Sequence, residues 1–120
     1  FRGASGGHCD TAAAANLTIV VAPLVRGRIP TVVNKVTTCI TPGSSIDVLV
    51  TDHGIAVNPA RPEVKERLLA AKLPIMSIEE LSKRAYSLTG MPAEIEYTDR
   101  IVGVIRYRDG SIIDVVKQVK

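Results

Sequence analysis

The amino-acid sequence predicts an α/β fold with a mainly parallel sheet, flanking helices and a C-terminal β-hairpin. The chain is 46% hydrophobic but only 3% aromatic, so its core must be built from Val, Ile, Leu and Ala, as buried parallel sheets usually are. Apolar runs of strand length are interspersed with two segments of helical pattern. Asp109-Gly110 lies between two apolar runs, which is a strong signal of a hairpin.

The first half of the chain is expected to be rich in strands. Asp10 or Thr11 caps a short helical turn through the following Ala run, and Asn16 ends it. A turn is expected over 41–45, and His53-Gly54 allows a short hairpin. Apolar, β-branched runs predict a buried strand over 17–24 and further strands over 31–40, 46–52 and 55–58.

The second half contains two expected helices. Pro62 is well placed as a first helical residue, and a helix follows over 63–72. After a short buried strand over 74–76, Ser77 and Glu80 have the spacing of a capping box, and Gly90 ends that second helix. Residues 101–107 and 111–116 form the expected C-terminal hairpin.

Composition excludes several classes of function. The net charge of +3 comes from scattered Lys and Arg residues, so no basic face for nucleic acid is expected. Cys9 and Cys39 lack the spacing of a metal site and fit reduced thiols in a cytoplasmic protein. Apolar runs fall short of a membrane span. The start at Phe1, without Met or a signal peptide, looks like a cut through a longer polypeptide.

The loop around Gly6 and Gly7 is the most informative local feature. Two glycines let the backbone approach a ligand, so that consecutive N–H groups converge on an oxyanion, and a following helix adds favourable partial charge. The same pair also serves a plain tight turn. The loop lacks the pattern of a P-loop or of a dinucleotide site, so nucleotide phosphates are not indicated.

Three side chains after this loop have both chemical and structural interpretations. His8 either contacts a substrate carboxylate or transfers a proton, or is a partly exposed loop residue. Asp10 is a helix cap or a catalytic carboxylate. Cys9 is a candidate nucleophile, but a small buried residue is the favoured interpretation because no base is assignable.

Charged residues at two strand ends are further candidates. Arg26 and Arg28 flank Gly27 and either pair with anionic groups or are solvated. Asp52 and His53 follow a predicted strand, where α/β proteins often place ligand contacts, although a simple turn is favoured.

Five segments together resemble the citrate lyase alpha chain family, within the CoA-transferase superfamily, over nearly the whole chain. They are residues 5–12, 17–24, 26–33, 41–59 and 98–110. The resemblance implies a CoA-transferase-like fold, with residues 1–120 as the C-terminal part of such a domain. The superfamily's Gly-Gly-x-x-Asp loop and Thr-Asp strand end would correspond here to Gly6, Gly7, Asp10, Thr51 and Asp52.

The resemblance also implies a reaction. Acetyl-[acyl-carrier protein] and citrate would give citryl-[acyl-carrier protein] and acetate, through an anhydride and without a covalent enzyme glutamate. The chain itself would bind no cofactor, since the CoA-derived phosphopantetheine group belongs to the acyl-carrier gamma chain. A beta chain would cleave the citryl thioester, and an oligomer is expected. Gly6 and Gly7 would stabilise the oxyanion, with His8, Asp10, Arg26 and Arg28 as candidate substrate-binding residues.

Two other functions stay open at this point. The chain could be a non-catalytic domain that docks partner subunits. It could also be part of a related CoA transferase or thioester hydrolase that acts on another carboxylic acid, because Gly-Gly-x-x-Asp alone does not select citrate. The upstream half that should complete the site is missing, so the isolated 120 residues are expected to have little or no transferase activity.

Overall fold

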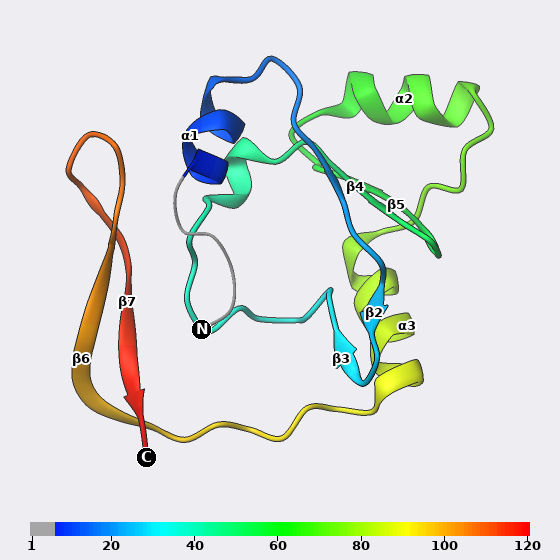
Figure 1. Cartoon of the computed structure of the whole chain (residues 1–120). Coiled ribbons are helices and arrows are strands. Elements are labelled where there is room, and N and C mark those ends of the chain that lie inside the picture. Colours follow the sequence, from blue (N-terminus) through cyan, green and yellow to red (C-terminus); the bar gives the residue numbers. More distant parts are fainter. Residues whose placement is uncertain (1–6) are drawn as a thin grey trace.

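The computed structural model describes residues 7–120 as a flat α/β arrangement measuring 49 × 37 × 19 Å. Figure 1 shows a long C-terminal hairpin at one side and a small sheet with two helices at the other, with α1 and a long loop between them. The elements are α1 (Gly7–Ala14), β1 (Ile19–Val21), β2 (Val25–Arg26), β3 (Ile29–Pro30), η1 (Gly43–Ser45), β4 (Val48–Thr51), β5 (Gly54–Val57), α2 (Pro62–Ala70), α3 (Ile78–Thr89), β6 (Tyr97–Arg106) and β7 (Ile112–Val119).

The expected mixture of helices and strands is confirmed, but the mainly parallel sheet is wrong for the described residues. The three-stranded sheet has the order β1-β4-β5, in which only β1 and β4 run parallel. The pairs β2–β3 and β6–β7 are antiparallel hairpins. The physical reason is connection length, because a turn of a few residues can join only antiparallel neighbours. A high content of Val, Ile and Leu therefore does not distinguish parallel from antiparallel strand pairing.

The predicted strand over 17–24 is shorter and less buried than expected. Only Ile19–Val21 forms β1, with exposed fractions of 52% for Ile19 and 77% for Val21. Leu24, beyond the strand, is fully buried. Ile19 and Val21 are alternate residues of β1 and therefore share one face of the sheet, and this face is left exposed within the described part of the chain.

The predicted strand over 31–40 is absent from the structure. Its backbone is held instead by groups from distant elements, since Cys39 N–H donates to Asp114 at 2.7 Å and Asn34 N–H donates to the Tyr86 hydroxyl at 2.9 Å. Thr38 adds a side-chain bond to the Val115 carbonyl at 3.2 Å. The first two bonds satisfy backbone N–H groups of the segment without a β-ladder, so its β-branched composition alone predicted the wrong structure.

The predicted hairpins and helices of the later chain are confirmed. β4 and β5 pair through a turn at Asp52-His53, and α2 begins at Pro62. The side chain of Ser77 accepts from Glu80 N–H and the side chain of Glu80 accepts from Ser77 N–H, which completes the capping box of α3. The helix ends at Gly90, where φ is +75°. The strand expected over 74–76 is reduced to one parallel bridge, from Ile75 to Ile55.

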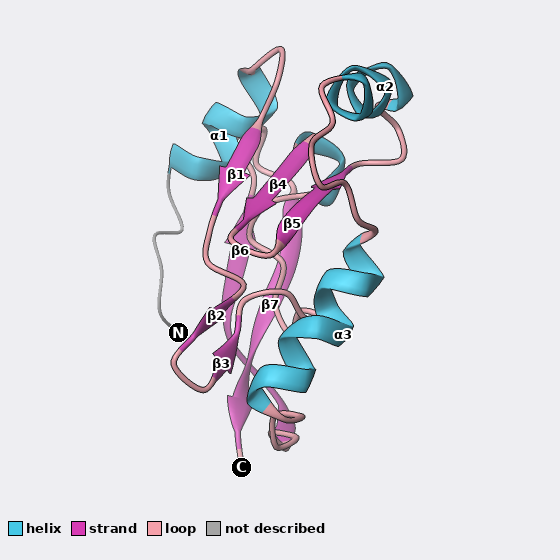
Figure 2. Ribbon diagram, turned by 90° about the vertical axis from the view of Figure 1, so that its right-hand side faces the viewer, coloured by secondary structure: helices cyan, strands magenta, loops and turns pink. Residues whose placement is uncertain are grey.

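A small core lies where α3 covers the β2–β3 hairpin and β5. Figure 2 shows α3 beside these strands, with the β6–β7 hairpin behind the sheet. Partly buried Val25, Leu49 and Met76 pack around this cluster. Its buried members are Leu24, Val32, Ala56, Leu81 and Ala85.

Candidate site at helix α1

The N-terminus of α1 is the part of the predicted glycine loop that the structure describes. Gly7 is the first residue of the helix, whereas Gly6 lies outside the described residues. The helix therefore begins earlier than the cap predicted at Asp10 or Thr11. Gly7 is not among the glycines with positive φ, so its backbone is helical rather than left-handed. The first N–H groups of a helix lack intrahelical acceptors and carry partial positive charge.

Open space surrounds Gly7. Among the described residues, a Cβ built at this position would have no heavy atom within 4 Å outside its immediate neighbours and its own helix. The hydroxyl of Thr11, one turn on, donates to the Gly7 carbonyl at 2.8 Å and tightens this first turn. The N-terminal end of the helix is thus exposed, which leaves room for a ligand oxygen, and the Thr11 hydrogen bond stabilises its first turn.

His8 lies on the exposed side of this turn and contacts a residue that the sequence analysis did not single out. Its Nδ1 is 3.0 Å from the Thr41 hydroxyl, which comes from the loop before η1. This contact orients the ring and leaves Nε2 as the second polar atom of the imidazole. The structure therefore brings His8 to the helix end together with Thr41.

The other two candidates in α1 have structural surroundings. Cys9 is buried, as predicted, and burial raises the pKa of its thiol, with smaller contributions from Asp10 and Cys39. A protonated buried thiol is a poor nucleophile. Asp10 is inside the helix rather than at its cap, and its Oδ2 lies 3.7 Å from Nε of Arg108 in the β6–β7 turn.

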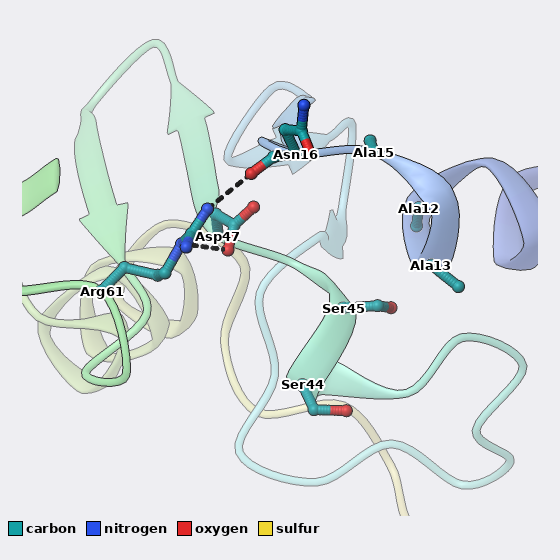
Figure 3. A pocket seen from close by; sticks show the side chains of 8 residues that line it. All are labelled: Ala12, Ala13, Ala15, Asn16, Ser44, Ser45, Asp47 and Arg61. Atoms are coloured by element: carbon teal, nitrogen blue, oxygen red, sulfur yellow. Dashed lines mark hydrogen bonds and ion pairs between the residues drawn. The ribbon is translucent and has the colours of Figure 1, made fainter.

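Two hollows border α1. One, of about 260 Å³, lies between the helix and the β6–β7 turn. The other is an open depression of about 470 Å³ at the C-terminal end of α1, and Figure 3 shows the side chains that line it. Their residues are Ala12, Ala13, Ala15, Asn16, Ser44, Ser45, Asp47 and Arg61.

Arg61 and Asp47 connect three segments in the larger depression. Arg61 Nε lies 2.8 Å from Asp47 Oδ1, and Nη2 donates to the Asn16 carbonyl at 2.6 Å. Asp47 Oδ2 accepts from Thr18 N–H at 2.7 Å. Much of the guanidinium is therefore committed to protein groups, so the pair positions the end of α1 against the sheet rather than presenting a free cation (Figure 3).

The remaining predicted site residues lie elsewhere. Arg26 ends β2 and Arg28 is in the exposed β2–β3 turn, where Gly27 has φ +59°. Figures 1 and 2 both place this hairpin away from α1. Asp52 accepts from Leu24 N–H at 2.8 Å, and this bond holds the pKa of the carboxyl below its usual range. The structure thus gives Asp52 a bracing role in the turn.

Sequence reasoning missed the contacts that surround α1. Thr41 and Arg108 contact His8 and Asp10 of the helix. Asp47 and Arg61 bond to the segment just after it, at Thr18 and Asn16, and no spacing along the sequence signals this convergence. Within residues 7–120 no group of three or more His, Cys, Asp or Glu side chains is arranged to hold a metal ion. No helix in that same range is long and apolar enough to cross a membrane.

Comparison of the sequence with known proteins identifies the family of the chain. Residues 1–119 match the family Citrate lyase, alpha subunit (CitF). The citrate lyase alpha chains of Escherichia coli and Haemophilus influenzae are 71% and 65% identical to the chain over all 120 residues. Those 120 residues span 24% of the length of each relative, about a quarter.

A solved structure supports the same assignment. It is described as the alpha subunit of citrate lyase from Streptococcus mutans in complex with citrate, and it is 59% identical with a TM-score of 0.94. The match covers 99% of this chain and 23% of that one. On the family match over nearly every residue, the chain belongs to the citrate lyase alpha subunit family.

Proposed function

We propose that this chain forms one wall of an acyl-transfer site that exchanges acetyl for citryl on an acyl-carrier protein. Acetyl-[acyl-carrier protein] and citrate would give citryl-[acyl-carrier protein] and acetate. The observation that carries the proposal is the 0.94 TM-score, at 59% identity, to a citrate lyase alpha subunit solved in complex with citrate. Because the chain spans about a quarter of its relatives, the remaining wall would come from the rest of a full-length alpha chain.

The N-terminus of α1 is the proposed oxyanion-stabilising element. Attack of a citrate carboxylate on an acetyl thioester places negative charge on the thioester oxygen, and preorganised N–H donors lower the energy of that state. Gly7 supplies such a donor at the positive end of α1, in open space. His8, held by Thr41, would hydrogen-bond a citrate carboxylate beside it.

The other predicted site residues have separate roles in this proposal. Gly6 would add a second N–H donor next to Gly7. Asp10 would position Arg108 at the edge of the site, since their charged groups lie 3.7 Å apart. Arg26 and Arg28 would bind anionic groups only if a ligand extended to the β2–β3 turn.

The proposed partners follow from the reaction. The carrier's CoA-derived phosphopantetheine thiol would bring the acetyl group, so the alpha chain would bind no cofactor of its own. The designation alpha chain of the relatives indicates an enzyme of several subunits, and we propose a beta chain and an acyl-carrier gamma chain as the others. The free thiols of Cys9 and Cys39 fit a cytoplasmic location.

Substitution of Gly7 tests the proposed role. In a full-length alpha chain that carries these 120 residues, Gly7→Val should leave folding intact, because among residues 7–120 nothing beyond the helix itself lies within 4 Å of the added Cβ. The branched side chain should nevertheless block close approach of the acyl oxygen and lower the rate of citrate–acetate exchange by about 10²-fold, the scale of losing one oxyanion donor. Gly43→Val is the matched control, since that site is equally open.

The outcomes separate the alternatives. Lost exchange with intact subunit assembly supports the oxyanion role. Lost assembly with unchanged exchange per assembled complex supports a docking domain instead, and unchanged exchange and assembly would refute any role for the α1 terminus. Repeating the assay of the parent chain with a panel of carboxylic acids tests citrate, because faster exchange with another acid would favour a related CoA transferase or thioester hydrolase.

A further inference from the structure

The exposed apolar side chains of the β6–β7 hairpin form the most conspicuous surface feature outside the candidate site. Alternate residues of a strand point to opposite faces. Asp114, paired with Ile105, points toward Cys39 and the 31–40 segment. Val104, paired with Val115, therefore points the other way. Register shifts near Ile101 and Arg106 interrupt this alternation. Exposed apolar side chains along the two strands are Ile101 at 55%, Val102 at 56%, Val104 at 48% and Ile112 at 60%, with Val119 at 53% near the end of β7.

We call Ile101, Val102, Val104 and Ile112 the hairpin patch. A two-stranded ribbon is at best marginally stable in water without a covered apolar face. The hairpin is joined to the other described residues by few polar contacts: Thr38 to Val115, Cys39 to Asp114, and Asp10 to Arg108. Figure 1 shows the hairpin standing at one edge of the molecule, away from the α3 core. Several exposed apolar side chains gathered on one hairpin are typical of a surface that another protein surface covers.

The total surface indicates how large the covering partner must be. The accessible surface of the chain is 8652 Å². A compact monomer of 12.8 kDa exposes about 6,300 Å², so this chain exposes about 2,400 Å² more. A standard protein–protein interface covers about 800 Å² on each partner. The excess is about three times that area, so over the whole chain it is larger than one ordinary subunit contact would cover.

We propose that the hairpin patch packs against the part of the full-length alpha chain that lies outside these 120 residues. Relatives supply that occupant, because about three quarters of their length lies outside the match. The packing would fix the β6–β7 turn, and with it Arg108, relative to α1. This inference does not depend on the acyl-transfer reaction, since it concerns only which protein surface covers the hairpin.

Cysteine labelling in a full-length alpha chain that carries these residues tests the proposal. Val104→Cys and Ile112→Cys would be labelled with a maleimide in native buffer and in urea, and the ratio of rates gives the protection of each site. Lys65→Cys, on exposed α2, is the control. We expect the two hairpin sites to be at least about tenfold better protected than the control in the monomeric chain without other subunits.

Three results would overturn the proposal. Hairpin sites labelled as fast as the control would show that nothing covers the patch. Protection that appears only as the chain dimerises would assign the patch to a second copy, and protection that requires the companion subunits would assign it to them. Hydrogen exchange checks the hairpin without relying on the variants, because a covering surface should slow exchange of the β6–β7 amides in the monomeric full-length chain relative to the 120 residues alone, where the same ladder bonds are present.

Discussion

Replacement of Leu81 by Ala tests whether the small core under α3 holds the fold together. Leu81 is fully buried, and the substitution removes three carbon atoms. At about 0.8 kcal/mol for each, the lost transfer free energy is about 2.4 kcal/mol, and the cavity raises the expected loss to about 3–5 kcal/mol. Leu88 lies two turns further along the same helix face but is 55% exposed, so Leu88→Ala should cost only about 1 kcal/mol.

Urea denaturation of the 120-residue chain, followed by circular dichroism, measures the difference. With a slope of about 2 kcal/mol/M, Leu81→Ala should lower the midpoint by about 1.5–2.5 M and Leu88→Ala by about 0.5 M. Both changes replace Leu by Ala on one helix, so the difference in helix propensity cancels. Equal midpoints for the two variants would refute the assignment of the core to this end of α3.

Two further predictions concern a backbone amide that a side chain hydrogen-bonds and a glycine that a side chain approaches closely. The pKa of Asp114 is lowered chiefly by the Cys39 N–H bond, so protection of the Cys39 amide from hydrogen exchange should be full above the ordinary Asp pKa and lost as pH falls through the lowered value. Protection that stays constant through this acidic range would contradict the bond. Gly54→Ala would place a Cβ 2.5 Å from Met76 Sδ and should destabilise the chain by about 1–3 kcal/mol in thermal melts, whereas Gly43→Ala, in open space, should be nearly neutral.

Local chemistry made several elements predictable. The capping box of Ser77 and Glu80, the helix start at Pro62 and the Asp109-Gly110 turn each depend on residues within a few positions of one another. Such features need no knowledge of the rest of the fold, because the atoms that interact are already close along the chain. Their confirmed positions follow from that proximity.

Predictions that required distant partners were less accurate. The 31–40 segment has strand-like composition, yet Asp114 and Tyr86 satisfy its backbone from other elements. Likewise, Asp10 was expected to cap a helix, but α1 already begins at Gly7 and Asp10 faces Arg108 instead. For the 31–40 segment the deciding contacts cross a large sequence separation, which propensity does not encode.

The sequence by itself determined the family resemblance, the mixed α/β composition and the local turns and caps, because these depend on residue identity and short spacing. Only the tertiary structure decided that antiparallel pairing predominates in the described chain, that Thr41 holds His8, and that Asp47 and Arg61 join α1 to the sheet. These pairings and contacts join groups that are far apart in the sequence. They form only when the whole chain folds and its backbone polar atoms and charges find partners.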